Sequence, residues 1–127
     1  MSVLIEFVLV AVGGAVGGVA RYGLSVAVDR RTGRGFPWGT LLVNVSGAFV
    51  IGALAGWTGT AVLEGESSRL WVVLAIGVLG SYTTVSSFSL QVVELARDGR
   101  GVRAVWYVVG SFGLCLLAAA AGLAVLS

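Results

Sequence analysis

The sequence lacks histidine, and it has a single cysteine, Cys115, among its 127 residues. Without histidine or a cluster of cysteines, the common protein ligands of zinc and other transition metals are missing. One cysteine also excludes a disulfide bond within the chain. We therefore expect neither a transition-metal centre nor an internal covalent cross-link.

Charged residues are scarce as well. Asp, Glu, Lys and Arg make up 11% of the chain, hydrophobic residues make up 57%, and the mean hydropathy is +1.01. A soluble domain of this length needs a polar shell, and these residues are too few to build one. The formal net charge of +2 gives no argument for nucleic-acid binding in so apolar a chain. The composition favours a membrane protein.

Four apolar stretches lie between the charged clusters, each near the ~20 residues that cross a bilayer. They run at roughly 3–26, 38–60, 70–95 and 104–126. We predict one all-α domain over 1–127, with four transmembrane helices. Trp38 and Trp57 bracket the second stretch as interfacial aromatic residues do. The first stretch begins with Glu6 and no basic residue, unlike a signal peptide, so we expect a mature helix there.

Arginine is unevenly distributed between the two sides of this predicted bundle. The first and third loops share one side and carry six arginines, namely Arg30, Arg31, Arg34, Arg97, Arg100 and Arg103. The opposite side, with both termini and the middle loop, carries only Arg69. Because arginine-rich loops stay in the cytoplasm, we expect a multi-pass protein of the plasma membrane with both termini outside.

The third stretch contains glycines and hydroxyl groups at a depth where hydrocarbon would surround them. Its segment GVLGSYTTVSSFSL, residues 77–90, has two glycines and seven hydroxyl side chains. A continuous helix accommodates hydroxyls by bonding them to preceding carbonyl groups. A helix broken in mid-span frees carbonyl groups for a cation and N–H groups for an anion, as in discontinuous transport helices. So many hydroxyls together favour the broken helix.

Two further polar features lie within the other stretches. Asn44 is near the middle of the second stretch, with Thr40 one turn earlier, and its amide is equally suited to bonding another helix and to facing a pore. In the last stretch, Tyr107, Ser111 and Cys115 recur at four-residue spacing. Hydrogen bonding between helices is the favoured interpretation of that stripe taken alone.

Ionised groups are missing from the centres of the stretches. Arg21 lies near the end of the first stretch, where it can snorkel toward the arginine-rich side, attract anions to a vestibule, or do both. No carboxylate lies deep in any stretch, whereas a proton-coupled exporter of organic cations needs one. Neutral donors suit a small anion instead. Each hydrogen bond to an ion returns ~1.5–3 kcal/mol against a Born penalty on the order of tens of kcal/mol, so several donors or a nearby fixed positive charge are required.

Three segments together resemble the Fluc (CrcB) family of fluoride channels. They are GGAVGGVARYGL in the first stretch, GTLLVNVSGAFVIG in the second and GVLGSYTTVSSFS in the third. The resemblance covers nearly the whole chain in order. It implies a channel rather than an enzyme, built as an antiparallel, dual-topology dimer of four-helix subunits with two fluoride pores. Such channels lower cytoplasmic fluoride.

The resemblance also implies the residues of the site. A structural sodium ion, which is not transported, would lie at the dimer centre on the backbone carbonyls of Gly80 and Thr83. The fluoride pathway would include Asn44 and Phe88, together with a polar track and an entry arginine formed by Thr40, Tyr107, Ser111 and Arg21. The chain departs from the family at Val85, where a second phenylalanine is usual, and valine has no aromatic edge to offer to fluoride.

The arginine asymmetry and Val85 motivate a more specific hypothesis. An antiparallel homodimer needs one chain to insert both ways, which favours balanced loops, so this chain is expected to be half of a heterodimer with a related, oppositely oriented subunit. Two alternatives remain. One is a small dual-topology multidrug exporter, and the other is a non-conducting scaffold subunit, which would be indifferent to substitutions at Asn44 or Phe88.

Overall fold

The computed structural model describes residues 3–33, 35–58 and 72–126. In chain order its elements are α1 (Val3–Thr32), α2 (Trp38–Thr58), the π-helix η2 (Val72–Leu79), α4 (Gly80–Tyr82), α5 (Val85–Arg97) and α6 (Gly101–Leu126). Every element in these ranges is helical, as the composition predicts. Three of them, α1, α2 and α6, are long and apolar enough to cross a membrane. Most large apolar side chains of α1 and α6 are exposed, which suits contact with lipid.

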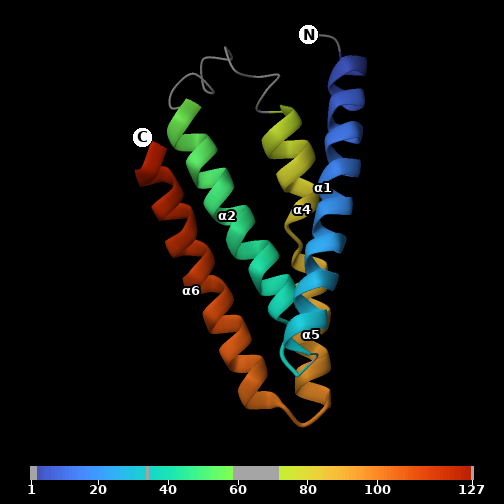
Figure 1. Cartoon of the computed structure of the whole chain (residues 1–127), viewed down its shortest axis with the longest axis vertical. Coiled ribbons are helices and arrows are strands. Elements are labelled where there is room, and N and C mark those ends of the chain that lie inside the picture. The colour runs from blue at the N-terminus through green and yellow to red at the C-terminus, as the bar shows by residue number, and fades with distance from the viewer. Residues whose placement is uncertain (1–2, 34, 59–71, 127) are drawn as a thin grey trace.

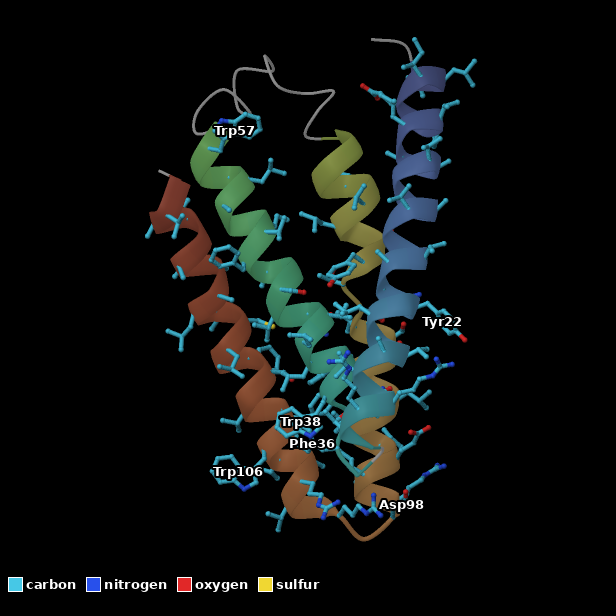
Figure 2. The ribbon with its side chains drawn as sticks, in the orientation of Figure 1. Tyr22, Phe36, Trp38, Trp57, Asp98 and Trp106 are labelled. Atoms are coloured by element: carbon cyan, nitrogen blue, oxygen red, sulfur yellow. The ribbon has the colours of Figure 1, made fainter. Side chains whose placement is uncertain are left out.

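The helices lie lengthwise in a narrow bundle, with both chain termini at one end (Figure 1). The connections from α1 to α2 and from α5 to α6 lie at the other end. Helix α2 packs along α6, and α1 packs along η2 and α4. Trp38 and Trp106 lie near one end of the bundle and Trp57 at the opposite end (Figure 2), as residues of two membrane interfaces would.

Helix α1 continues to Thr32, beyond the stretch predicted from hydropathy. Arg30 and Arg31 lie in its last turn, where the helix dipole favours cations. Gly33 then ends the helix with a φ of 81°, and its N–H bonds to the carbonyl of Asp29 at 2.9 Å. The charged residues therefore belong to the end of the helix rather than to a loop.

Helix α2 begins at Trp38, as predicted, and is tied at its start to α1. The Asp29 carboxylate accepts a hydrogen bond from the N–H of Gly39 at 3.2 Å. A carboxylate is favourable at a helix N-terminus because it satisfies an otherwise unpaired N–H group and complements the dipole. Asp29 thus fixes the start of α2 against the end of α1.

From Val72 onward, the residues of the third predicted stretch form three helical pieces. Helices η2 and α4 follow each other directly, and α4 ends at Tyr82. Thr83 and Thr84 are extended, with ψ values of 154° and 121°. Helix α5 then starts afresh, with the Thr84 hydroxyl accepting from the N–H of Ser87 at 3.1 Å as its N-cap.

Glycines bring the helix backbones into close contact. A Cβ atom at Gly17 would overlap the carbonyl oxygen of Val78 and the hydroxyl of Ser81, and one at Gly52 would overlap the carbonyl of Ala119. Small residues of this kind allow close helix packing in lipid. Gly17 therefore allows close packing of α1 on η2 and α4, and Gly52 allows close packing of α2 on α6.

The buried core lies toward the end of the bundle that carries all the described arginines except Arg21. Leu41, Leu95, Ala104 and Tyr107 form its buried cluster. The arginines at this end belong to the last turns of α1 and α5 and to the start of α6 and its preceding turn. One of them, Arg103, donates to the carbonyl of Gly35 at 2.9 Å. Arg34 and Arg69 of the predicted asymmetry lie outside the described residues.

Candidate functional site

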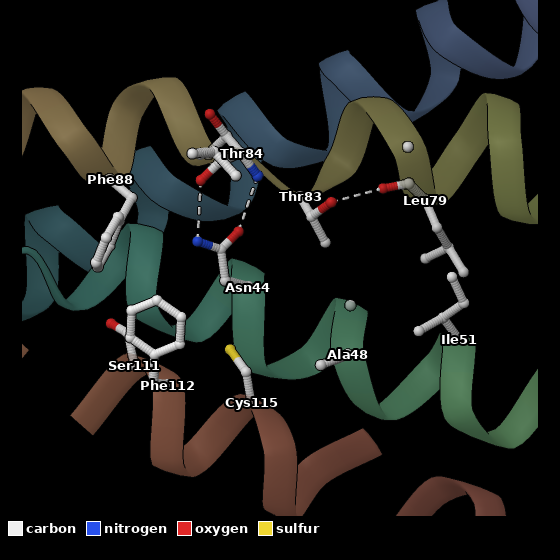
Figure 3. A pocket seen from close by; sticks show the side chains of 13 residues that line it. Asn44, Ala48, Ile51, Leu79, Thr83, Thr84, Phe88, Ser111, Phe112 and Cys115 are labelled. Atoms are coloured by element: carbon white, nitrogen blue, oxygen red, sulfur yellow. Dashed lines mark hydrogen bonds between the residues drawn. The ribbon is translucent and has the colours of Figure 1, made fainter. Parts of the chain in front are cut away.

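The extended junction between α4 and α5 is held by one amide side chain (Figure 3). Nδ2 of Asn44 donates to the carbonyl of Thr84 at 3.1 Å, and the N–H of Thr84 donates to Oδ1 of Asn44 at 2.9 Å. The side chain of Asn44 on α2 therefore pairs with the Thr84 backbone as a neighbouring strand would. Non-helical backbone is tolerated at membrane depth where protein groups satisfy it in this way.

This pairing changes the hydrogen bonding of two carbonyl groups. In a continuous α-helix, the N–H of Thr84 would bond to the carbonyl of Gly80, and that of Ser87 to the carbonyl of Thr83. Here the first N–H bonds to Asn44 and the second to the hydroxyl of Thr84. The carbonyls of Gly80 and Thr83 have thus lost their helical donors. They are the same two carbonyls that the family resemblance assigns to sodium.

Several hydroxyls near the junction bond to backbone carbonyls. The Ser81 hydroxyl lies 2.8 Å from the carbonyl of Gly14 on α1 and 2.9 Å from that of Gly77. The Thr83 hydroxyl donates to the carbonyl of Leu79 at 3.1 Å. These hydroxyls join helices and bond to backbone carbonyls near the end of α4. The number of hydroxyls in the sequence therefore overstates how many are free for a ligand.

A cavity of about 380 Å³ opens beside the junction (Figure 3). Its lining comes from α2, from the junction, and from α5 and α6: Asn44, Gly47, Ala48, Ile51, Leu79, Gly80, Thr83, Thr84, Val85, Phe88, Ser111, Phe112 and Cys115. The Ser111 hydroxyl is buried and has no hydrogen-bond partner within the described part of the chain. Buried hydroxyls are normally paired, so Ser111 has bonding capacity for a ligand.

Tyr107 lies one turn from Ser111 on α6 and is completely buried. Its hydroxyl donates to Oε1 of Gln91 at 2.9 Å, and the Thr40 side chain lies close to it. Its ring packs 4.9 Å from that of Phe88, measured between centroids. The structure therefore brings Thr40, Tyr107 and Phe88 into one contact network at the border of the cavity.

Gln91 is a residue of this network that the sequence analysis missed. Its polar side chain lies on the same helix as Phe88, three positions later, and that spacing places both on one face of α5. This spacing could have identified Gln91 as a neighbour of Phe88. It could not have identified Tyr107 as the partner of Gln91, because that pairing depends on how α5 packs against α6.

Val85 and Arg21 lie outside the contact network of Thr40, Tyr107 and Phe88. Val85 lines the cavity from the first turn of α5 and is 79% exposed. Arg21 is half-buried on α1, 11 residues before the helix ends at Thr32, which is about 16 Å along the axis. Arg21 is not among the residues that line the cavity, so this chain by itself does not bring it to the others.

Comparison with known proteins identifies the family. The family model described as "CrcB-like protein, Camphor Resistance (CrcB)" matches residues 8–123. The chain belongs to the CrcB family. The matched CrcB range includes every residue discussed for the cavity and its border.

Curated CrcB relatives are similar over most of their length. The chain is 50% identical over 115 residues to "Fluoride-specific ion channel FluC 3" of Brucella suis biovar 1, which covers 91% of this chain and 86% of the relative. It is 48% identical over 123 residues to "Fluoride-specific ion channel FluC 2" of Bradyrhizobium diazoefficiens, covering 94% and 88%. It is 45% identical over 121 residues to "Fluoride-specific ion channel FluC" of Rhizobium meliloti, covering 95% of each.

Replacing the amide of Asn44 tests its role at the junction. Asn44→Leu removes both bonds to Thr84 and leaves a buried N–H and a buried carbonyl unpaired, at about 1–3 kcal/mol for each group. We expect amide hydrogen exchange in residues 83–88 to become at least about tenfold faster, measured by mass spectrometry on the purified protein. Ser111→Ala is the control, because it alters the cavity without contacting Thr84, and should leave exchange unchanged. Unaltered exchange in Asn44→Leu would contradict the assigned role.

Proposed function

We propose that this chain is a subunit of a fluoride-selective ion channel that lets fluoride leave the cell and lowers its cytoplasmic concentration. The observation that carries the proposal is the identity of 45–50% to relatives named fluoride-specific ion channels, over most of each chain. The cavity chemistry supports the proposal independently.

The lining of the cavity suits a small anion. Asn44 uses one amide N–H on Thr84 and retains a second, since an amide carries two, and Ser111 has an unpaired hydroxyl. Phe88 adds a ring whose edge carries partial positive charge. Among the described residues, none that lines this cavity is acidic, so nothing there resembles the site of a proton-coupled cation exporter.

We further propose that η2, α4 and α5 together form one membrane span interrupted at Thr83 and Thr84. Two features support this. Thr83 and Thr84 are extended, and the residues before and after them continue toward opposite ends of the bundle (Figure 1). In this arrangement the bundle crosses the bilayer four times, with both termini outside and with Arg30, Arg31, Arg97, Arg100 and Arg103 on the cytoplasmic side.

We propose that a sodium ion lies against the carbonyls of Gly80 and Thr83. Both carbonyls have lost their helical N–H donors, and hard cations prefer oxygen ligands. Two subunits related by an antiparallel axis would supply two such pairs around one ion. When bound, the ion adds a fixed positive charge close to the cavity. The chain would hold the ion through backbone atoms, so side-chain identity would matter less there.

We also propose that the working channel is a heterodimer of this chain with a related subunit of opposite orientation. All the described arginines except Arg21 gather at one end of the bundle, which favours a single orientation. Val85, exposed at the cavity, supplies no ring edge, so an aromatic group at that point would have to come from the partner.

Fluoride efflux from liposomes tests the channel function. We expect the protein, reconstituted with a related CrcB-family subunit of reversed arginine bias, to release fluoride and retain chloride, as followed with ion-selective electrodes. Phe88→Ala should lower fluoride efflux about tenfold or more, because it removes the ring that borders the cavity. Val109→Ala on the exposed side of α6 is the control. The absence of fluoride efflux above that of empty liposomes, or equal passage of chloride, would contradict the proposal.

Reconstitution of this chain alone tests the pairing. Because one orientation predominates, we expect the chain without a partner to give less than about a tenth of the fluoride efflux of the pair. Chemical labelling of a cysteine introduced at Ser2 in sealed cells should report a single accessible side. Equal efflux with and without the partner, together with labelling from both sides, would refute the heterodimer.

Removal of sodium tests the proposed ion. Replacing sodium on both sides of the membrane with a large organic cation should lower fluoride efflux about tenfold, and adding sodium back should restore it. Potassium, which is larger, is the control ion and should restore less. Efflux that is indifferent to sodium at every concentration would exclude a required sodium site at these carbonyls.

A further inference from the structure

A second cavity, of about 180 Å³, lies at the end of the bundle that carries the described arginines. Its ionisable lining residues are Asp29, Glu94, Asp98 and Arg100, and its neutral polar lining residue is Gln91. Phe88 lines the first cavity and packs on the ring of Tyr107, while Gln91 lines the second and accepts a hydrogen bond from the Tyr107 hydroxyl. Tyr107 therefore stands between the two cavities, with one neighbour in each.

The Tyr107 ring is held rigidly in this position. The side chain is fully buried, with the Phe88 ring at 4.9 Å and the Phe36 ring edge-on at 5.4 Å. Its freedom is therefore confined to the direction of the hydroxyl proton. In the structure that proton is directed at Oε1 of Gln91, so the hydroxyl cannot at the same time donate to an anion.

The chemistry of an amide allows this arrangement to reverse. A glutamine has an acceptor oxygen and a donor nitrogen at nearly the same place, and rotation about its last bond exchanges them. With Nε2 toward Tyr107, Gln91 would donate to the phenolic oxygen, and the tyrosine proton would be free to donate elsewhere. The exchange replaces one neutral hydrogen bond by another, and the buried Tyr107 proton would then be paired by fluoride.

We propose that Gln91 is a positioning residue of the fluoride pathway, which controls whether the Tyr107 hydroxyl is available to fluoride passing between the two cavities. The inference rests on the proposed channel function. The second cavity has three carboxylates and one guanidinium, so its charge repels fluoride. Passage of fluoride between the two cavities then depends on neutral hydrogen-bond donors. Tyr107 is the donor whose proton Gln91 directs.

A double-mutant cycle tests the link between the two residues. Gln91→Met keeps the length of the side chain and the helix propensity but removes the amide, and Tyr107→Phe removes the hydroxyl. In the assembly that conducts fluoride, we expect each variant to lower efflux about tenfold, because Gln91→Met removes the Nε2 donor that turns the Tyr107 proton toward fluoride and Tyr107→Phe removes the proton itself. We expect the double variant to be no slower than the slower single variant, because both changes remove the same function.

Controls separate positioning from folding. Val93→Met, on the exposed part of the same helix, should conduct as the wild type does. The assembly mass and thermal unfolding temperature of Gln91→Met should match those of the wild type, while its preference for fluoride over chloride falls. Gln91→Ala serves as a second amide-free variant if Gln91→Met fails to assemble.

Two results would overturn the inference. The first is efflux of an assembled Gln91 variant within twofold of the wild type, and the second is a double variant whose loss equals the product of the two single losses. A wild-type protein that carries no fluoride contradicts the proposed function instead. A conducting wild type with unaffected Gln91 variants contradicts this inference alone.

Discussion

The paired hydrogen bonds between Asn44 and the Thr84 backbone are the interaction on which the rest of the structure depends. In hydrocarbon, an extended stretch of backbone would leave N–H and carbonyl groups unpaired at several kcal/mol for each group, on the order of the transfer cost of a peptide. One amide side chain from α2 satisfies both groups of Thr84. Without such a partner, helical bonding across the junction would be the more stable arrangement, and the carbonyls of Gly80 and Thr83 would recover their donors.

The contacts around the cavity follow from that junction. Thr84 caps α5, so the start of the helix is fixed, and Phe88 is placed one turn later beside the cavity. Phe88 in turn packs on Tyr107, whose hydroxyl bonds to Gln91. A continuous series of contacts therefore connects the middle of the bundle to its arginine-bearing end. The proposed fluoride pathway uses this series, in which neutral donors replace water without fixing the ion by opposite charge.

The sequence predicts the helical class and the start of α2 at Trp38 well, because hydropathy and interfacial tryptophans report directly on contact with lipid. It predicts the end of α1 poorly, because Arg30 and Arg31 lower the hydropathy while their charge stabilises the last turn. Asn44 was open to two interpretations because its partner lies 40 residues away. Gln91 was missed, because its partner Tyr107 is set by packing between helices rather than by any local pattern.

The most direct test of the account is the backbone conformation at the junction in a lipid bilayer. Solid-state NMR of protein labelled with ¹³C and ¹⁵N at threonine and asparagine yields the torsion angles and the contact between the Asn44 amide and the Thr84 backbone. The account predicts extended residues, with ψ near 154° at Thr83 and 121° at Thr84, and a close Asn44–Thr84 contact. Helical ψ values of about −42° at both residues, with no such contact, would contradict it.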